Sequence, residues 1–187
     1  MPRDKKYNEV EVLERAMDLF WKSGYNSTSL RMLSKEMGIN QFSINASFGN
    51  KQAVFLESLK MYKTKLHQLL KTFEDSSNGI ENIKNFFYAF AAFTNLDNTK
   101  RGCLMVNTMS EFGLEMDEQV GSLISNYEQH LRALFKKNLE FASTKDTETI
   151  KKQVNYLVLA IGGLGLATKV QEQNVIEDYI EMTFTNI

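Results

Sequence analysis

The chain has 187 residues, of which 43% are hydrophobic and 24% charged, and its formal net charge is −1. A near-neutral charge excludes a globally basic surface, and the single cysteine excludes an internal disulfide and suits a reducing cytoplasm. The longest apolar run, residues 156–167, is shorter than the about 20 residues that cross a bilayer. The first residues lack the apolar core of a signal peptide, so we expect a cytoplasmic protein without membrane contact.

Residues 12–55 have the pattern of three short helices in close succession. Apolar residues recur at helical spacing in the first of them: Leu13, Ala16, Met17 and Phe20. Gly24 suits a helix end, and Thr28 is placed to cap the second helix with its hydroxyl. Gly38 ends the second helix, and Asn40 can cap the third. This order predicts a helix-turn-helix with a supporting first helix, which makes duplex DNA the first partner to consider.

The third predicted helix, about residues 40–47, is the segment that we expect to enter the major groove. Gln41 and Asn45 are the candidates for base edges, because amide side chains pair with adenine. Hydroxyl and basic side chains are the candidates for phosphate contacts: Thr28, Ser29, Arg31, Ser43 and Lys51. Asn40 and Phe42 complete the predicted DNA-binding set.

The rest of the chain is periodic at helical spacing and has no alternating strand pattern. Helices are expected at about 51 to the mid-70s, 80–95, 102–112, 116–141, 147–171 and 174–186. The prediction is an all-α protein of about nine helices, with a helix-turn-helix domain over residues 1–50 and a larger helical domain over 51–187. Residues 1–51 carry eight Lys or Arg and six Asp or Glu, so a small basic excess falls on the first domain.

The first 55 or so residues resemble the DNA-binding domain of the tetracycline-repressor (TetR) family. The matching residues are Ala16, Leu19, Phe20, Gly24, Thr28, Ser29, Leu33, Gly38, Ile39, Ser43, Ile44, Phe48 and Lys51. The resemblance implies a bacterial transcription regulator that binds a two-fold operator as a homodimer. It also implies that residues 51–187 bind a ligand and form the dimer. The family usually has Tyr directly after the position of Ile44, where this chain has Asn45.

Five aromatic residues cluster in the fifth predicted helix: Phe86, Phe87, Tyr88, Phe90 and Phe93. They can be the core of a helical bundle, or they can line an apolar ligand pocket. In the family that the chain resembles, inducers bind in the equivalent region. Phe86 and Phe90 are therefore the candidate ligand contacts.

Three glycines, Gly162, Gly163 and Gly165, interrupt the eighth predicted helix. Each costs roughly 1 kcal/mol of helix stability relative to Ala, so something should offset them. They can allow close approach of a second subunit or mark a kink within one chain. The resemblance favours the interface, since members of the family dimerise through their last two helices.

Cys103 lies at the expected start of the sixth helix, directly after Arg101 and Gly102. A helix N-terminus and a neighbouring arginine favour a thiolate, whereas the alternative is a buried structural cysteine. The segment 102–112 resembles a subgroup of the family in which some members sense electrophiles or oxidants through this cysteine. Some of these also have a lysine at the position of Lys169. Cys103 and Lys169 are therefore candidate sensor residues.

The sequence thus predicts a ligand-responsive DNA-binding regulator, and a repressor in particular. A small apolar ligand or modification of Cys103 would release it from its operator. The competing class is a helical carrier or enzyme that uses the aromatic cavity. We expect no enzyme activity, no cofactor and no metal site, because the two histidines are far apart and no nucleotide-binding motif is present.

Overall fold

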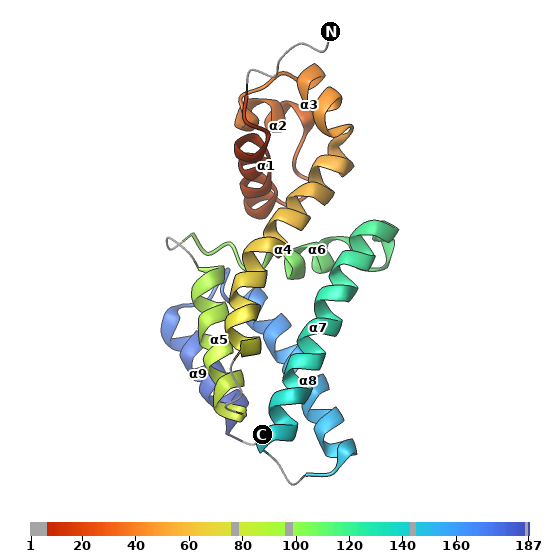
Figure 1. Cartoon of the computed structure of the whole chain (residues 1–187). Coiled ribbons are helices and arrows are strands. Elements are labelled where there is room, and N and C mark those ends of the chain that lie inside the picture. The colour runs from red at the N-terminus through yellow and green to blue at the C-terminus, as the bar shows by residue number, and fades with distance from the viewer. Residues whose placement is uncertain (1–6, 76–78, 96–98, 143–144, 186) are drawn as a thin grey trace.

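The structure is a computed structural model that describes residues 7–75, 79–95, 99–142, 145–185 and 187. Within these ranges the chain forms nine α-helices and no strand, which confirms the all-α prediction. The helices are α1 (Glu9–Ser23), α2 (Leu30–Met37), α3 (Gln41–Phe48), α4 (Lys51–Asp75), α5 (Ile80–Thr94), α6 (Leu104–Phe112), α7 (Glu118–Ala142), α8 (Thr147–Ala167) and α9 (Gln173–Phe184). They form a small unit above a larger bundle, and α4 passes from one to the other (Figure 1).

The small unit consists of α1, α2, α3 and the first turns of α4. Its core includes Phe20 of α1 and Phe55 of α4, whose ring centroids lie 4.9 Å apart. Leu33 and Met37 are the buried residues of α2, and Ile44 is the buried residue of α3. Because α3 buries so little of itself, most of its surface faces outward.

Short polar side chains fix the helix starts in this unit. Asn40 caps α3 by accepting from the Ser43 amide at 2.8 Å, as predicted. The predicted cap of α2 was wrong: Ser29, not Thr28, accepts from an amide of that helix. Thr28 donates instead to the carbonyl of Gly24 at 2.6 Å and is buried. Gly38, at φ +69°, makes the left-handed turn between α2 and α3 that side chains disfavour.

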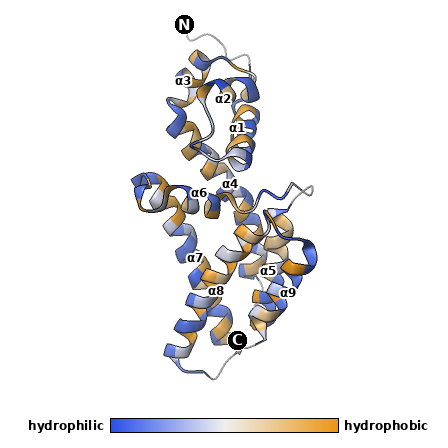
Figure 2. Ribbon diagram, turned by 180° about the vertical axis from the view of Figure 1, so that it is seen from behind, coloured by the Kyte–Doolittle hydropathy of each residue, from blue (hydrophilic) through white to orange (hydrophobic). Residues whose placement is uncertain are grey.

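The larger unit is a bundle of α5, α7, α8, α9 and the rest of α4. Helix α7 packs on α8 and α4, while α5 packs on α4, α7, α8 and α9. Hydrophobic segments run along α5 and α8 (Figure 2). No helix in the described ranges is long and apolar enough to cross a membrane.

Helix α6 lies at the junction of the two units and runs across the direction of α4 (Figure 1). Cys103 is its N-cap, so the helix begins at Leu104 rather than at the predicted residue 102. A turn of 3-10 helix, Gly113–Glu115, follows α6, so α7 begins later than predicted. Helix α8 ends at Ala167, four residues before the predicted end, because residues 168–170 form a tighter turn. The expected last residue of α9, Asn186, lies outside the described residues.

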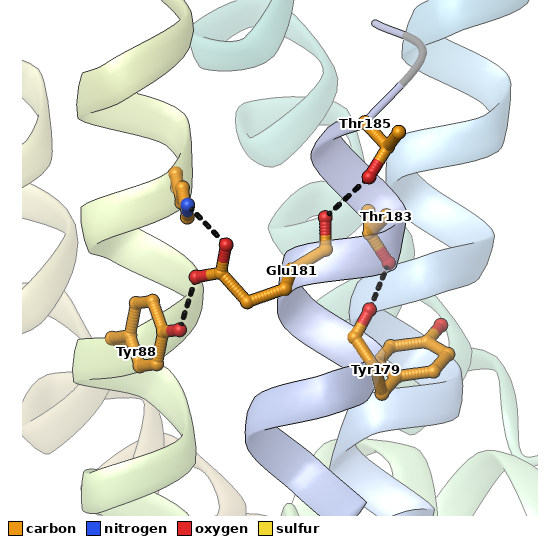
Figure 3. A network of polar contacts seen from close by, with 6 residues as sticks. Tyr88, Tyr179, Glu181, Thr183 and Thr185 are labelled. Atoms are coloured by element: carbon orange, nitrogen blue, oxygen red, sulfur yellow. Dashed lines mark hydrogen bonds and ion pairs between the residues drawn. The ribbon is translucent and has the colours of Figure 1, made fainter.

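A polar network joins α5 to α9 (Figure 3). The Glu181 carboxylate accepts from the Tyr88 hydroxyl at 2.6 Å and pairs with the Lys84 amine at 2.7 Å. The hydrogen bond to Glu181 raises the pKa of Tyr88 to about 12, and the same contacts lower the pKa of Glu181. These bonds fix one side of α9 to the bundle and leave its other side facing solvent.

Candidate nucleic-acid interface and the neighbouring cavity

The outward face of α3 is formed by Gln41, Phe42, Asn45 and Ala46, all of which are exposed. Phe42 is 82% exposed, which is unusual for a large aromatic side chain. The face carries two amides and two apolar side chains and no charge. Such a surface suits contacts with base edges better than contacts with phosphates.

Three hydrogen bonds hold α3 in place. The Tyr7 hydroxyl bonds the Ser47 hydroxyl at 2.8 Å, and the Ser34 hydroxyl donates to the carbonyl of Ile39 at 2.6 Å, in the turn before α3. The Tyr7 hydroxyl also donates to the carbonyl of Ser43, at 3.4 Å. Sequence reasoning missed Tyr7, because a residue before the first helix gives no signal of a contact with the third.

The predicted phosphate contacts differ in their exposure. Ser29 and Arg31 are exposed at the start of α2. Lys51 starts α4, and its amine lies 4.0 Å from the ring centroid of Tyr25. Partial burial lowers the pKa of Lys51, and the charge of Glu111 opposes this shift. Thr28 is only 1% exposed and its hydroxyl is occupied, so it offers no surface to a phosphate.

A cavity of about 490 Å³ lies in the larger unit, between α6, α7 and α8. Its lining is mostly apolar and includes Phe90, Met105, Tyr127, Leu131 and Ile161. The charged residues of the lining are Glu128 and Arg132, which pair with each other at 2.9 Å. Arg132 also donates to Asn155 at 2.7 Å. The volume and lining are those of a site for a small, neutral, apolar molecule.

The two aromatic candidates have different surroundings. Phe90 lines the cavity, as expected of a ligand contact. Phe86 does not: its ring stacks on Phe73 at 4.7 Å and lies 6.1 Å from the ring of Phe135. Phe86 is therefore a core residue, because its helix face points to α4 and α7 rather than to α6.

The thiol of Cys103 has a raised pKa, contrary to the lowered value expected at a helix N-terminus. The side chain is fully buried, and burial raises its pKa more than the Tyr62 hydroxyl and the amides of Val106 and Met105 lower it. The expected help from Arg101 is also missing, since its guanidinium pairs with Asp18 at 2.9 Å. Burial therefore favours the structural alternative for Cys103 over an activated thiolate.

Lys169 and Gly165 lie close to the segment that precedes α6. The amide of Cys103 donates to the carbonyl of Gly165 at 3.1 Å. A Cβ on Gly102 would lie 2.6 Å from that carbonyl oxygen and 2.5 Å from Cγ of Lys169. Lys169 itself is exposed, in the turn after α8. Its methylene groups cover Gly102.

The three glycines of α8 do not share one role. Gly165 is buried, and a Cβ there would lie 3.1 Å from Cβ of Cys103, so this glycine permits a contact within the chain. Its assignment to a dimer interface was wrong, because packing against α6 already explains it. Gly163 is exposed beside the Tyr179 hydroxyl, and Gly162 lines the cavity. These two keep their predicted assignment as a proposal.

Apolar side chains of α8, of α9 and of the turn after α8 are exposed: Tyr156, Leu159, Leu166, Val170, Val175 and Met182. Two of them, Leu159 and Leu166, also line the cavity. Leu159 and Leu166 are seven residues apart, which places them on the same side of α8. We call this set the α8–α9 surface.

Hydrogen bonds, an ion pair and ring packing connect α6 and its preceding loop to the small unit, and the Phe112 ring of α6 lies 5.2 Å from the Tyr25 ring. The Trp21 indole donates to the carbonyl of Gly102 at 2.8 Å, and Arg101 pairs with Asp18. At the other end of α6, the Glu111 carboxylate accepts from the amides of Tyr25 and Asn26, at 2.9 and 2.6 Å. Sequence reasoning gave these residues no such role, because their partners lie more than 80 positions away.

The sequence of the chain is similar to those of bacterial transcriptional regulators. Residues 12–58 match the tetR family of bacterial regulatory proteins. The chain is 30% identical over 137 residues to the HTH-type transcriptional repressor ComR of Escherichia coli. The aligned region covers 71% of this chain and 64% of ComR. It is 28% identical over 112 residues to the uncharacterized HTH-type transcriptional regulator YezE of Bacillus subtilis, over 59% of this chain and 58% of YezE. The chain thus matches less than two thirds of the length of either relative.

A solved structure shares the fold over nearly the whole chain. It is a cysteine mutant of the TetR family regulator CifR, complexed with 26-base-pair operator DNA. The TM-score is 0.84 at 22% identity, and the match covers 98% of this chain and 99% of the other. The helix-turn-helix of residues 12–58 thus matches the tetR family of bacterial regulatory proteins, and the chain shares the fold of a TetR family regulator.

Proposed function

We propose that the protein is a homodimeric transcriptional repressor in the cytoplasm, and that it leaves its operator when a small apolar molecule fills the cavity between α6, α7 and α8. In this proposal residues 1–50 form the DNA-binding domain and residues 51–187 the ligand-binding and dimerisation domain. The family excludes the carrier and enzyme alternative, since its members are DNA-binding regulators.

The outward face of α3 supports sequence-specific binding. Gln41 and Asn45 present amides that can form paired hydrogen bonds with adenine in the major groove. Ser29, Arg31 and Lys51 are the candidates for phosphates that flank that groove, and such contacts would position the helix without reading sequence. Asn45 replaces the Tyr usual in the family, so it has a shorter reach and offers an amide to a base.

The α8–α9 surface supports a dimer. Leu159 is 76% and Met182 is 67% exposed, and exposed apolar side chains of neighbouring helices usually mark a protein contact. Gly162 and Gly163 lie on this side of α8 and would let a second backbone approach. A two-fold dimer places two copies of α3 about one helical turn of DNA apart, or a multiple of it.

The single observation that carries the release mechanism is the double role of α6. Met105, Val106, Met109 and Ser110 line the cavity, while Glu111 of the same helix holds the loop between α1 and α2. A ligand that displaces α6 would therefore move the small unit on the bundle. The two copies of α3 would then no longer match the spacing of both half-sites.

Cys103 takes no part in this proposal as a reactive thiol. Its burial and its raised pKa favour a structural role beside Gly165. A ligand that fills the cavity is then the signal. Glu128 and Arg132 neutralise each other's charge, which favours an uncharged ligand.

The proposal is tested by selecting DNA from a random duplex library with the purified protein. We expect the recovered sequences to share a two-fold motif, and each duplex to bind two protomers in sedimentation. Recovery of no shared motif, or of a motif without two-fold symmetry bound by a single protomer, would contradict the proposal.

A further inference from the structure

The outward face of α3 is divided into two strips. Gln41 and Asn45 are four residues apart and lie one above the other on the helix, and so do Phe42 and Ala46. The first pair forms an amide strip and the second an apolar strip. Both strips are exposed, and no charged residue belongs to either.

The exposure of Phe42 is not a by-product of packing. The helix buries Ile44 against the small unit, while Phe42 lies on the other side and is 82% exposed. Tyr7 fixes the opposite side of the helix through Ser47, so the orientation of the apolar strip is set before any partner binds. The Phe42 side chain thus contributes little buried area to the fold.

The chemistry of the major groove indicates what the apolar strip meets. Among the groups that base pairs present there, the apolar one is the C5 methyl of thymine, and Phe and Ala side chains contact it. The amide strip beside it suits adenine, the partner of thymine. One face of α3 therefore carries the complements of both bases of an A·T pair.

We infer that Phe42 is a specificity-determining residue that reads the methyl group of a thymine in each half-site, beside an adenine read by the amide strip. This inference rests on the proposed function, because it requires α3 to enter the major groove. It goes beyond that function by naming the base and the chemical group. The operator half-site then contains a thymine whose replacement by uracil lowers the affinity of the protein for the operator.

The test replaces single thymines of the selected operator with deoxyuridine, which keeps base pairing and removes the methyl group. Fluorescence anisotropy then measures the affinity of the full-length protein. We expect a loss of roughly three- to fivefold at one thymine per half-site, as for the transfer of one methyl group out of an apolar contact. The variant Phe42→Ala should bind the thymine operator more weakly and should no longer distinguish thymine from uracil there.

Two controls separate this reading from its alternatives. Gln41→Ala should bind more weakly but keep the thymine preference at the Phe42 position. Phe42→Ala should keep the melting temperature and the dimer of the wild type, because the side chain is exposed. Equal affinity of the wild type for every uracil operator, while it still prefers the operator over random DNA, would overturn this inference alone. Failure to select any sequence would overturn both this inference and the proposed function.

Discussion

The thiol of Cys103 is enclosed by α6, α8 and the ring of Tyr62, so its helix N-terminal position does not make it reactive. Desolvation penalises the thiolate more than nearby hydrogen-bond donors stabilise it. A lone cysteine in a sequence cannot distinguish these outcomes, because both occur at helix starts. The enclosure itself comes from Gly165, which sequence reasoning assigned to another contact.

Alkylation of Cys103 should be slow in the folded protein. We expect iodoacetamide to react at least tenfold more slowly than with free cysteine at pH 8, and the rate to go on rising above pH 9, since burial raises the pKa. The same shift means that Cys103 stabilises the fold below its unfolded pKa and that this contribution is lost as pH rises through the folded value. Mass spectrometry of timed reactions measures the rate. Fast alkylation of Cys103 at pH 7 that also releases the protein from DNA would instead support a sensor role for this residue.

The two glycines Gly102 and Gly121 should respond to substitution in opposite directions. Gly102 has φ +70°, and a Cβ there would meet the Gly165 carbonyl at 2.6 Å, so Gly102→Ala should destabilise the protein by about 1–3 kcal/mol. At Gly121 of α7 the nearest atom to a Cβ is the Met116 sulfur at 3.9 Å, an ordinary contact, so Gly121→Ala should stabilise the helix by up to about 1 kcal/mol. Urea unfolding measures both. A neutral Gly102→Ala would show that the loop before α6 can move freely.

At the scale of elements, α6 is the helix that contacts both the small unit and the cavity. It is short, and Met105, Val106 and Met109 line the cavity. Glu111, Phe112 and the residues just before the helix contact the small unit. A displacement of this one helix therefore reaches the loop between α1 and α2 both through hydrogen bonds and through the packing of Phe112 on Tyr25.

Glu111→Gln should weaken the connection between α6 and the small unit. The carboxylate accepts from two amides, whereas an amide side chain offers one acceptor oxygen, so one bond is lost. We expect a loss of about 1.5–3 kcal/mol in local stability, seen as faster hydrogen exchange at the amides of Tyr25 and Asn26, together with weaker operator binding. Glu115→Gln, at an exposed carboxylate in the next turn, is the matched control. Unchanged exchange in Glu111→Gln would mean that these bonds do not hold the loop.

A charge placed on the α8–α9 surface should separate the dimer. Leu159→Glu and Met182→Glu would each bury a carboxylate in a dimer contact, which is costly without a partner. Analytical ultracentrifugation at micromolar concentration should show a shift to monomer in both variants. Leu114→Glu, at a leucine exposed in the turn after α6, should stay dimeric. A wild type that is already monomeric would remove this interface from the account.

The helices were predictable from local chemistry, and the contacts between them were not. Asn40 caps its helix as expected, since a cap is decided within four residues. The error at Thr28 has the same local origin, because two neighbouring hydroxyls can each serve and only one accepts an amide. Phe86 and Phe90 look alike in sequence, yet one packs on α4 and α7 and the other lines the cavity. That difference depends on the position of α6, which no local pattern records.

The whole molecule combines a helix-turn-helix unit and a larger helical bundle, a fold that it shares with a TetR family regulator. In the proposed function, the near-neutral net charge of −1 leaves DNA affinity to a few cations rather than to a general field. The candidate cations are Arg31 and Lys51. DNA binding should therefore weaken as salt rises and still discriminate between sequences. A protein that bound DNA through charge alone would not distinguish one sequence from another.

The central claim is that the dimer reads a two-fold operator through α3. It is tested most directly by the affinity for the selected operator and for a scrambled duplex of equal length, measured by anisotropy from 50 to 300 mM salt. We expect both affinities to fall steeply with salt and the operator to keep an advantage of roughly a thousandfold or more. Gln41→Ala should reduce that advantage, while Lys51→Ala should lower both affinities alike. Equal affinity of the wild type for the two duplexes at every salt concentration would contradict the account.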